Sequence, residues 1–403
     1  MLGGPLRQLL PIPLLVTAMA VALLPVVGIG VLAGFMLEDL AINRTQLGLA
    51  ITAASATSAV TALGLGRFTD RQGGRNALTT VFILGGLATV GIAVAPVFGA
   101  LLAASAIGGL AMGSANPATN RFVVETVPRG QWGTITGIKQ SGEAITIVLC
   151  GAFLPTAALA VGWRWAFGLS ALVPLAAIAL VWLAIPSNPR PAAASAGSPP
   201  PRPIDRNIYW LAAYSLFVGL TAGSIATYLP LYTQEALGRS PASAGIVMAA
   251  MGVVAIVGRI SWGYFARGVG DLRSRLRTIA ALSIGGIALI WSASLIHPDL
   301  VWVGAAVWGV SILSVGALGN LAVMVYSVAE YTGRASGVML TGFGVGLMTG
   351  APVFGWTVDT TGEYHVGFAL LLIESIALTV VALLWGRRPF LGADTSARDG
   401  ATL

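Results

Sequence analysis

Residues 11–36 read PIPLLVTAMAVALLPVVGIGVLAGFM, a stretch that contains no charged side chain. A helix rises about 1.5 Å per residue, so about 20 apolar residues cross the ~30 Å hydrocarbon core of a bilayer. The stretch is too long for the hydrophobic part of a cleaved signal peptide, roughly 7–15 residues, and no convincing small-residue cleavage site follows it. It therefore predicts a membrane-spanning helix that remains in the protein.

Similar apolar runs recur along the whole chain of 403 residues, of which 56% are hydrophobic and 9% charged. A soluble domain carries roughly 25% charged residues, so this composition excludes a soluble fold of this size. The 52 glycines suit the close packing of helices in lipid. We predict twelve spans, at residues 11–36, 46–66, 76–97, 98–120, 134–158, 166–185, 208–233, 242–264, 277–296, 301–326, 337–357 and 365–386.

The positive side chains favour one orientation in the membrane. The formal net charge is +7, and most Lys and Arg fall in alternate loops, whereas Arg44, Arg164 and Arg239 lie in the other set of loops. Positive residues in short loops are retained on the cytoplasmic side. The pattern predicts a multi-pass protein of a cell inner (plasma) membrane with both termini cytoplasmic. It differs from the basic face of a nucleic-acid-binding protein.

A polar segment and an internal repeat divide the chain into two halves. Residues 186–207, PSNPRPAAASAGSPPPRPIDRN, predict a semi-rigid cytoplasmic linker. ETVPRGQWGTITG at 125–137 resembles EYTGRASGVMLTG at 330–342, and both segments lead into a predicted span. These positions fall six helices apart, which indicates parallel repeats. We therefore expect a first six-helix bundle at 1–185, a second at 208–388 and a cytoplasmic tail at 389–403.

The loop after the second predicted span reads GRFTDRQGGR, residues 66–75. It resembles the signature Gly-x-x-x-Asp-Arg-x-Gly-Arg-Arg/Lys that the major facilitator superfamily carries between its second and third helices, although Gly74 replaces a usual basic residue. GRISWGYFARGVGD at 258–271 resembles the degenerate copy between helices eight and nine. The positions that match the signature are Gly66, Asp70, Arg71, Gly73 and Arg75.

The resemblance implies an all-α membrane protein with twelve transmembrane helices in two pseudo-symmetric six-helix bundles, working by alternating access. It also implies that the matched residues take part in gating. Asp70, at the end of helix two, is placed to accept hydrogen bonds from the N-terminus of helix eleven near Gly337. Such a bond would hold the halves together on the cytoplasmic side. The alternative for the arginines is that they only enforce topology.

Ionisable groups within the spans are costly and usually face a cavity or a partner. Lys139 and Glu143 in helix five are one turn apart and are placed to pair. Glu143 is a candidate proton carrier or substrate contact, with Lys139 beside it, and the alternative is a structural pair. We interpret Arg259 as a brace for the neighbouring loop, for instance through Glu330. Glu374, in helix twelve, is interpreted as a structural acid.

Helices four, seven and ten add further candidates. In SANPATNR at 114–121, Pro117 frees a backbone carbonyl, and Arg121 can hold an anion, bond Glu125 or serve only as a topology charge. Helix seven carries an aromatic and hydroxylic stripe at helical spacing. The resemblance implies that helices one, four, seven and ten line a central cavity, and the alternative is ordinary packing. The candidates are Asn116, Asn120, Arg121, Tyr214, Phe217, Thr221, Ser224, Tyr228, Trp308, Ser311, Ser314 and Asn320.

The sequence predicts a secondary active transporter of a small solute. The chain has no P-loop for direct use of ATP, so an ion gradient or the gradient of the solute itself should drive transport, with protons as the default coupling ion. Drug exporters of the family often carry a Gly-Pro-rich motif in helix five, which SGEAITIVLCGAFLP at 141–155 lacks. Together with Lys139 and Arg121, this favours a small organic anion. The alternative is proton antiport of drugs and other amphipathic compounds.

We expect no enzymatic activity, because no catalytic constellation is recognisable. We also expect no cofactor and no metal, because Cys150, His297 and His365 form no ligand pattern. The expected partners are the solute, the lipid bilayer and protons, without nucleic acid, and the expected assembly is a monomer.

Overall fold

The computed structural model describes residues 11–128, 131–185, 204–265, 269–327 and 332–386, and they form helices with short connections. Three polar parts of the chain that the sequence analysis names lie outside these residues, namely most of 186–207, Glu330 and the tail at 389–403. The helices of the first half are α2 (Pro11–Val31), α3 (Ala33–Asp39), α4 (Arg44–Ala93), α5 (Phe98–Thr126), α6 (Trp132–Val161), α7 (Trp163–Ser170) and α8 (Leu172–Ala184).

The second half has a corresponding set of helices. They are α9 (Arg206–Glu235), α10 (Pro241–Phe265), α11 (Val269–Ser292), α12 (Leu300–Ser311), the 3-10 helix η2 (Ile312–Ser314), α13 (Val315–Tyr326), α14 (Thr332–Thr361) and α15 (His365–Leu384). The predicted span at 301–326 is thus interrupted by one tight turn at η2.

The number of spans agrees with the sequence prediction once α4 is divided. Within the described residues, eleven helices are long and apolar enough to cross a membrane. They include Gly73–Ala93 but not the preceding part of α4. Gly73 has φ 77° and ψ 163°, a backbone conformation that interrupts a helix and that glycine adopts readily. The part of α4 before Gly73 supplies the twelfth helix, and the fold is therefore the all-α, two-bundle membrane architecture that the sequence predicts.

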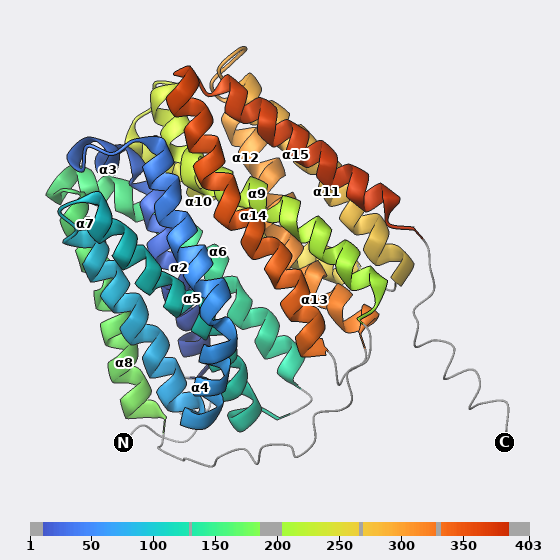
Figure 1. The fold of residues 1–403 in the computed structure, drawn as a ribbon. Helices are drawn as coiled ribbons and strands as arrows, with labels where there is room; N and C mark the ends of the chain where they lie inside the picture. The colour runs from blue at the N-terminus through green and yellow to red at the C-terminus, as the bar shows by residue number, and fades with distance from the viewer. Residues whose placement is uncertain (1–10, 129–130, 186–203, 266–268, 328–331, 387–403) are drawn as a thin grey trace.

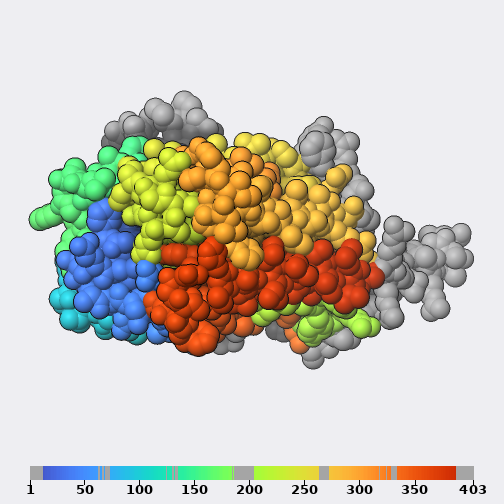
Figure 2. Space-filling view, turned by 90° about the horizontal axis from the view of Figure 1, so that it is seen from above, coloured from blue at the N-terminus to red at the C-terminus, as the bar shows by residue number. Residues whose placement is uncertain are grey.

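The two halves lie side by side (Figure 1). We call the end where α8 ends and α9 begins the linker end, at the bottom of the view, and the end that carries α3 and α7 the far end. Seen from the far end, atoms of the first half and of the second half meet along one seam (Figure 2). The ribbons of the two halves diverge toward the linker end (Figure 1).

Glycines show where the halves touch most closely. A Cβ placed on Gly48 of α4 would lie 2.6 Å from the backbone nitrogen of Pro352 on α14, and one on Gly245 of α10 would lie 2.2 Å from the Gly151 carbonyl of α6. Toward the linker end the same α4–α14 contact loosens. A Cβ on Gly344 would be 4.0 Å from Ala59, and one on Gly337 would meet no described atom within 4 Å. Among the described residues, the contact between α4 and α14 is therefore tight at the far end and looser toward the linker end.

Candidate functional site

Lys139, on α6, is buried inside the first half with only 1% of its surface exposed. Its ammonium group donates hydrogen bonds to three oxygens of α5, namely Asn116 Oδ1 at 3.3 Å, Thr119 Oγ1 at 2.7 Å and Asn120 Oδ1 at 2.6 Å. All three ammonium donors thus have acceptors. None of these acceptors is charged, so the hydrogen bonds satisfy the ammonium without neutralising it. This arrangement brings Lys139 and the α5 asparagines, which the sequence offers as separate candidates, into direct contact.

Glu143 lies one turn further along α6 and contacts the second half of the chain. Its Oε2 is 3.3 Å from Nη2 of Arg259 on α10. Arg259 also donates from Nη1 to the Gln140 carbonyl of α6 at 2.7 Å and from Nε to the Leu313 carbonyl of η2 at 2.9 Å. Arg259 therefore joins α10 and η2 to α6 across the seam.

These contacts correct two expectations from the sequence. The Glu143 carboxylate bonds to Arg259 of the other half, and Lys139 bonds to amide and hydroxyl oxygens, so the predicted Lys139–Glu143 pair was wrong as a direct contact. Arg259 contacts α6 and η2, and its expected partner Glu330 lies outside the described residues. The error arose because helical spacing identifies neighbours on one helix and gives no information on a residue of a facing helix.

Lys139 inside the first half and Arg259 across the seam together carry one more positive charge than the nearby Glu143 carboxylate balances. Lys139 and Arg259 are cations, and Glu143 is the carboxylate that contacts one of them. The side chain of Glu143 is 33% exposed and that of Arg259 is 16% exposed. Within the described ranges, no group of three or more His, Cys, Asp or Glu side chains is arranged to hold a metal ion. The chemistry available here is recognition of a negative group by an ammonium and a guanidinium.

Arg121 is engaged within the first half. Its Nε lies 2.6 Å from Glu125 Oε1, one helical turn along α5. The other oxygen of Glu125 accepts a hydrogen bond from the backbone nitrogen of Gly74 at 2.9 Å. Of the three interpretations of Arg121, the bond to Glu125 is the one that the structure shows. The pair also fixes the break in α4 next to Gly73.

The gating residues predicted from the loop at 66–75 are only partly described. Gly73 forms the break in α4, and Arg75 stacks over the ring of Trp182 on α8, with 4.2 Å between its guanidinium carbon and the ring centroid. The structure describes the backbone at Gly66, Asp70 and Arg71 but not the side chains or their surroundings. Their role in gating stays a prediction.

The hydroxylic stripe of α9 packs mainly inside the second half. Tyr214 is fully buried and donates to the Leu276 carbonyl of α11 at 3.0 Å, while Thr221 and Ser224 donate to carbonyls of α9 itself. Tyr228 reaches the first half, where its hydroxyl donates to the Arg44 carbonyl at 2.5 Å. The other candidates lie as follows: Phe217 is partly buried, Trp308, Ser311 and Ser314 are buried, and Asn320 is partly buried on α13.

A second polar cluster joins the halves at the far end, and the sequence analysis did not predict it. Arg44 Nη2 lies 2.5 Å from Glu235 Oε2, and Asp359 on α14 accepts from the backbone nitrogen of Arg44 at 3.1 Å. Thr45 donates to Asp359 Oδ2 from its backbone nitrogen at 2.7 Å and from its hydroxyl at 2.6 Å. Tyr364 donates to Glu235 Oε2 at 2.6 Å. An acid at the C-terminal end of a predicted span is a signal that such a partner exists, because its own helix end repels it.

Electrostatics keeps this cluster in its paired form. Burial lowers the pKa of the Arg44 guanidinium, but the hydrogen bonds and charges of Glu235 and Tyr364 raise it more, so its pKa is raised overall. Burial and the nearby Glu235 charge raise the pKa of Tyr364. At neutral pH, Arg44 is therefore charged and Tyr364 is a donor.

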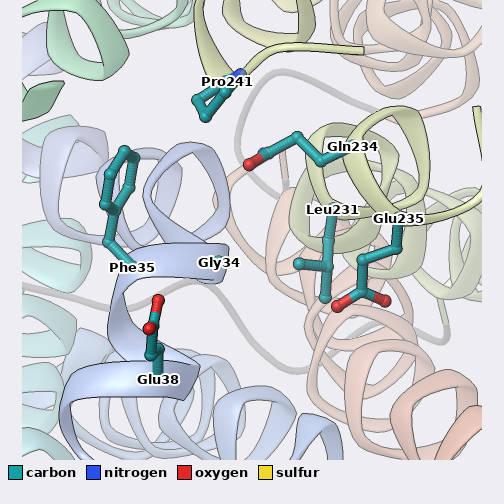
Figure 3. A pocket seen from close by; sticks show the side chains of 7 residues that line it. All are labelled: Gly34, Phe35, Glu38, Leu231, Gln234, Glu235 and Pro241. Atoms are coloured by element: carbon teal, nitrogen blue, oxygen red, sulfur yellow. The ribbon is translucent and has the colours of Figure 1, made fainter. Parts of the chain in front are cut away.

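A pocket of about 250 Å³ opens beside the far-end cluster. Figure 3 shows Glu38 of α3 and Gln234 and Glu235 of α9 around the same space, with Phe35 and Pro241 at its edge. Two carboxylates line this pocket, which makes it unsuitable for an anion. The pocket lies on the opposite side of the packed seam from the linker end.

The chain belongs to the major facilitator superfamily, since the family model of that name matches residues 15–346. The fold agrees with a solved structure, that of a bacterial homologue of the human lysosomal transporter Spinster in an inward-facing and occupied conformation. The TM-score is 0.72 with 17% sequence identity, and the match covers 95% of this chain and 97% of the other. The class of protein that the fold and the seam define is therefore a membrane transporter of small solutes.

Several curated relatives that resemble this chain over most of its length are named as transporters of sulfoacetate, nitrite or hexuronate. A probable sulfoacetate transporter of Cupriavidus necator is 26% identical, covering 89% of this chain and 88% of the relative. A nitrite extrusion protein of Bacillus subtilis is 25% identical over 86% of each chain. A hexuronate transporter of Bacillus subtilis is 22% identical over 92% of this chain and 93% of the relative.

Proposed function

We propose that the protein is a secondary active transporter of a small organic anion, working by alternating access and coupled to protons. The observation that carries this proposal is the position of two cations around Glu143: Arg259 contacts its carboxylate across the seam, and Lys139 lies one turn away from it on α6, bonded to neutral oxygens. An organic carboxylate or sulfonate would complete the charge balance of this group. Sulfoacetate, nitrite and hexuronate, named for the relatives, are all anions, which supports the same class of solute.

The proposal includes an orientation and an assembly. The distribution of Lys and Arg supports placing the linker end at the cytoplasm of a cell inner membrane, with both termini on that side. The linker end, where the described contact between α4 and α14 is looser, is then the cytoplasmic end, and the tightly packed far end faces outward. One chain contains both halves and the whole seam, so a monomer is sufficient for transport.

Glu143 provides a physical route to coupling. When Glu143 is charged, it occupies Nη2 of Arg259 and competes with an incoming anion. A proton on Glu143 removes this competitor and adds positive charge to the group as a whole. Proton binding and anion binding then favour one another, which is the thermodynamic requirement for symport.

The Glu143→Gln variant tests this coupling. In proteoliposomes, the wild type should accumulate sulfoacetate or a hexuronate when an inward proton gradient is imposed. The variant should still exchange labelled for unlabelled anion but should fail to accumulate it, because the carboxamide cannot bind and release the proton. The measurement is labelled-anion uptake with and without the proton gradient, followed by counterflow.

Glu363→Gln is the matched control, since Glu363 is an exposed glutamate beyond the far end of α14. It should behave as the wild type in both assays. If Glu143→Gln accumulates anion in response to the gradient as well as the control does, Glu143 is not the coupling group.

A further inference from the structure

We propose that Asp359 is the gating residue of the far end, holding the transporter closed on that side and releasing when the halves rock apart. The proposal rests on alternating access as the transport mechanism and is independent of which solute is carried. The observation that supports it is that the Asp359 carboxylate, in the second half, accepts three hydrogen bonds from the first turn of α4 in the first half.

The geometry places this carboxylate on the end of the facing helix. Asp359 lies near the C-terminal end of α14, where its own helix presents carbonyl oxygens and partial negative charge. Across the seam, α4 begins at Arg44, and its first backbone N–H groups have no partner within the helix. Asp359 accepts from the nitrogens of Arg44 and Thr45, with the Thr45 hydroxyl as a third donor. The carboxylate is thus stabilised by the other half and not by its own helix.

At the opposite end of α4 and α14, the sequence predicts a second contact of the same kind, between an acid of one helix and the N-terminus of the other. From the sequence, Asp70 at the end of the first part of α4 is expected to bond the N-terminus of α14 near Gly337. A Cβ on Gly337 would meet none of the described atoms within 4 Å, whereas a Cβ on Gly355 would lie 2.6 Å from the Arg44 carbonyl. With Asp70 in its predicted role, antiparallel α4 and α14 would provide one acid and one helix start at each end, so that closing one end would separate the groups at the other.

Neighbouring groups support Asp359 on the same surface. The Arg44 guanidinium lies 3.7 Å from Asp359 and 2.5 Å from Glu235, and Tyr228 donates to the Arg44 carbonyl. The Asp359 side chain is 16% exposed, so water competes little for it. Glu235 is 35% exposed and lines the pocket of Figure 3, so its pair with Arg44 is the more easily screened of the two. The main contribution to closure is therefore assigned to Asp359.

The test measures the closed and open populations directly, without solute. In a Cys150→Ser background, spin labels on Val97→Cys and Ala236→Cys report the far end, and labels on Asn76→Cys and Ser274→Cys report the linker end. These four positions are exposed. Pulsed electron–electron distance measurements are made on purified protein in lipid nanodiscs. Asp359→Asn removes the charge and two acceptor sites, so the ratio of far-end-closed to far-end-open protein should fall at least about tenfold.

Glu363→Gln removes the same charge from the same end of the protein, four residues away, and should leave both distance distributions unchanged. Thr45→Val removes the hydroxyl donor alone and should shift the ratio in the same direction by less. If Asp359→Asn does not fold, Thr45→Val decides the question. The proposal is overturned if Asp359→Asn keeps the wild-type distributions, if Glu363→Gln shifts them equally, or if Thr45→Val has no effect. A protein that shows the shift but transports no anion would instead contradict the proposed solute.

Discussion

Arg259→Gln should lower the rate of anion transport by about two orders of magnitude or more, the largest effect expected from a single substitution. Arg259 bonds Glu143, the Gln140 carbonyl and the Leu313 carbonyl from its three guanidinium nitrogens. Glutamine lacks the charge and the reach to replace these contacts. Loss of one partner from a partly buried charge pair costs about 2–5 kcal/mol, and each 1.4 kcal/mol is about tenfold. The measurement is initial uptake of labelled anion into proteoliposomes.

Two further variants separate loss of recognition from loss of structure. Arg259→Lys keeps the charge but not the planar fork, so it should retain measurable uptake with a raised KM. Arg239→Gln removes an arginine that pairs with Asp299 within the second half, and it should transport at the wild-type rate. Wild-type uptake by Arg259→Gln, in protein of confirmed orientation and amount, would remove Arg259 from the site.

Lys139→Gln should raise the KM for the anion about tenfold to a hundredfold while the protein remains folded. The glutamine amide can still donate to the oxygens of Asn116 and Asn120, so the packing of α6 on α5 is retained, but the positive charge is lost. Hydrogen bonds to a charged group contribute about 1.5–3 kcal/mol, which sets this range. KM and maximal rate are measured separately in the uptake assay.

Lys139→Met provides the structural comparison for this variant. Methionine has a similar length but no donor, so it leaves three oxygens of α5 without their partner and should also lower the thermal stability. If Lys139→Gln keeps the wild-type KM whereas Lys139→Met is unstable, Lys139 is a packing residue and takes no part in anion binding.

Much of the fold could be predicted from the chain because lipid imposes a simple rule. Each apolar run of about 20 residues becomes a helix, and the loop at 66–75 indicates the family. The family and the fold class were confirmed. The break in α4 at Gly73 falls inside the polar loop predicted at 66–75, whereas the interruption at η2 was not predicted, because one tight turn hardly changes the hydrophobic pattern.

The site was predicted only in part. Contacts between residues close in sequence could be predicted, whereas contacts between helices far apart in sequence could not. Lys139 and the α5 asparagines were proposed as members of one site and do lie together, and Arg121 was given Glu125 as one of two partners. The Arg259–Glu143 pair was missed because it joins two helices that no spacing relates.

Asp359 was missed for the same reason. Its three donors belong to a helix start more than three hundred residues earlier in the chain, and no local pattern near Asp359 identifies that partner. The general signal was present, since an acid near the C-terminal end of a helix requires stabilisation from elsewhere.

The central claim is that the seam between the halves binds an anion, and thermal unfolding of the purified wild-type protein with a solute panel tests it most directly. Sulfoacetate, hexuronates and short carboxylates should raise Tm saturably, since a ligand at 100 times its Kd stabilises the folded state by about 2.7 kcal/mol. The same anions should leave the Tm of Arg259→Gln unchanged. Saturable stabilisation by amphipathic amines and drugs, with no response to any anion, would contradict the account and favour drug export instead.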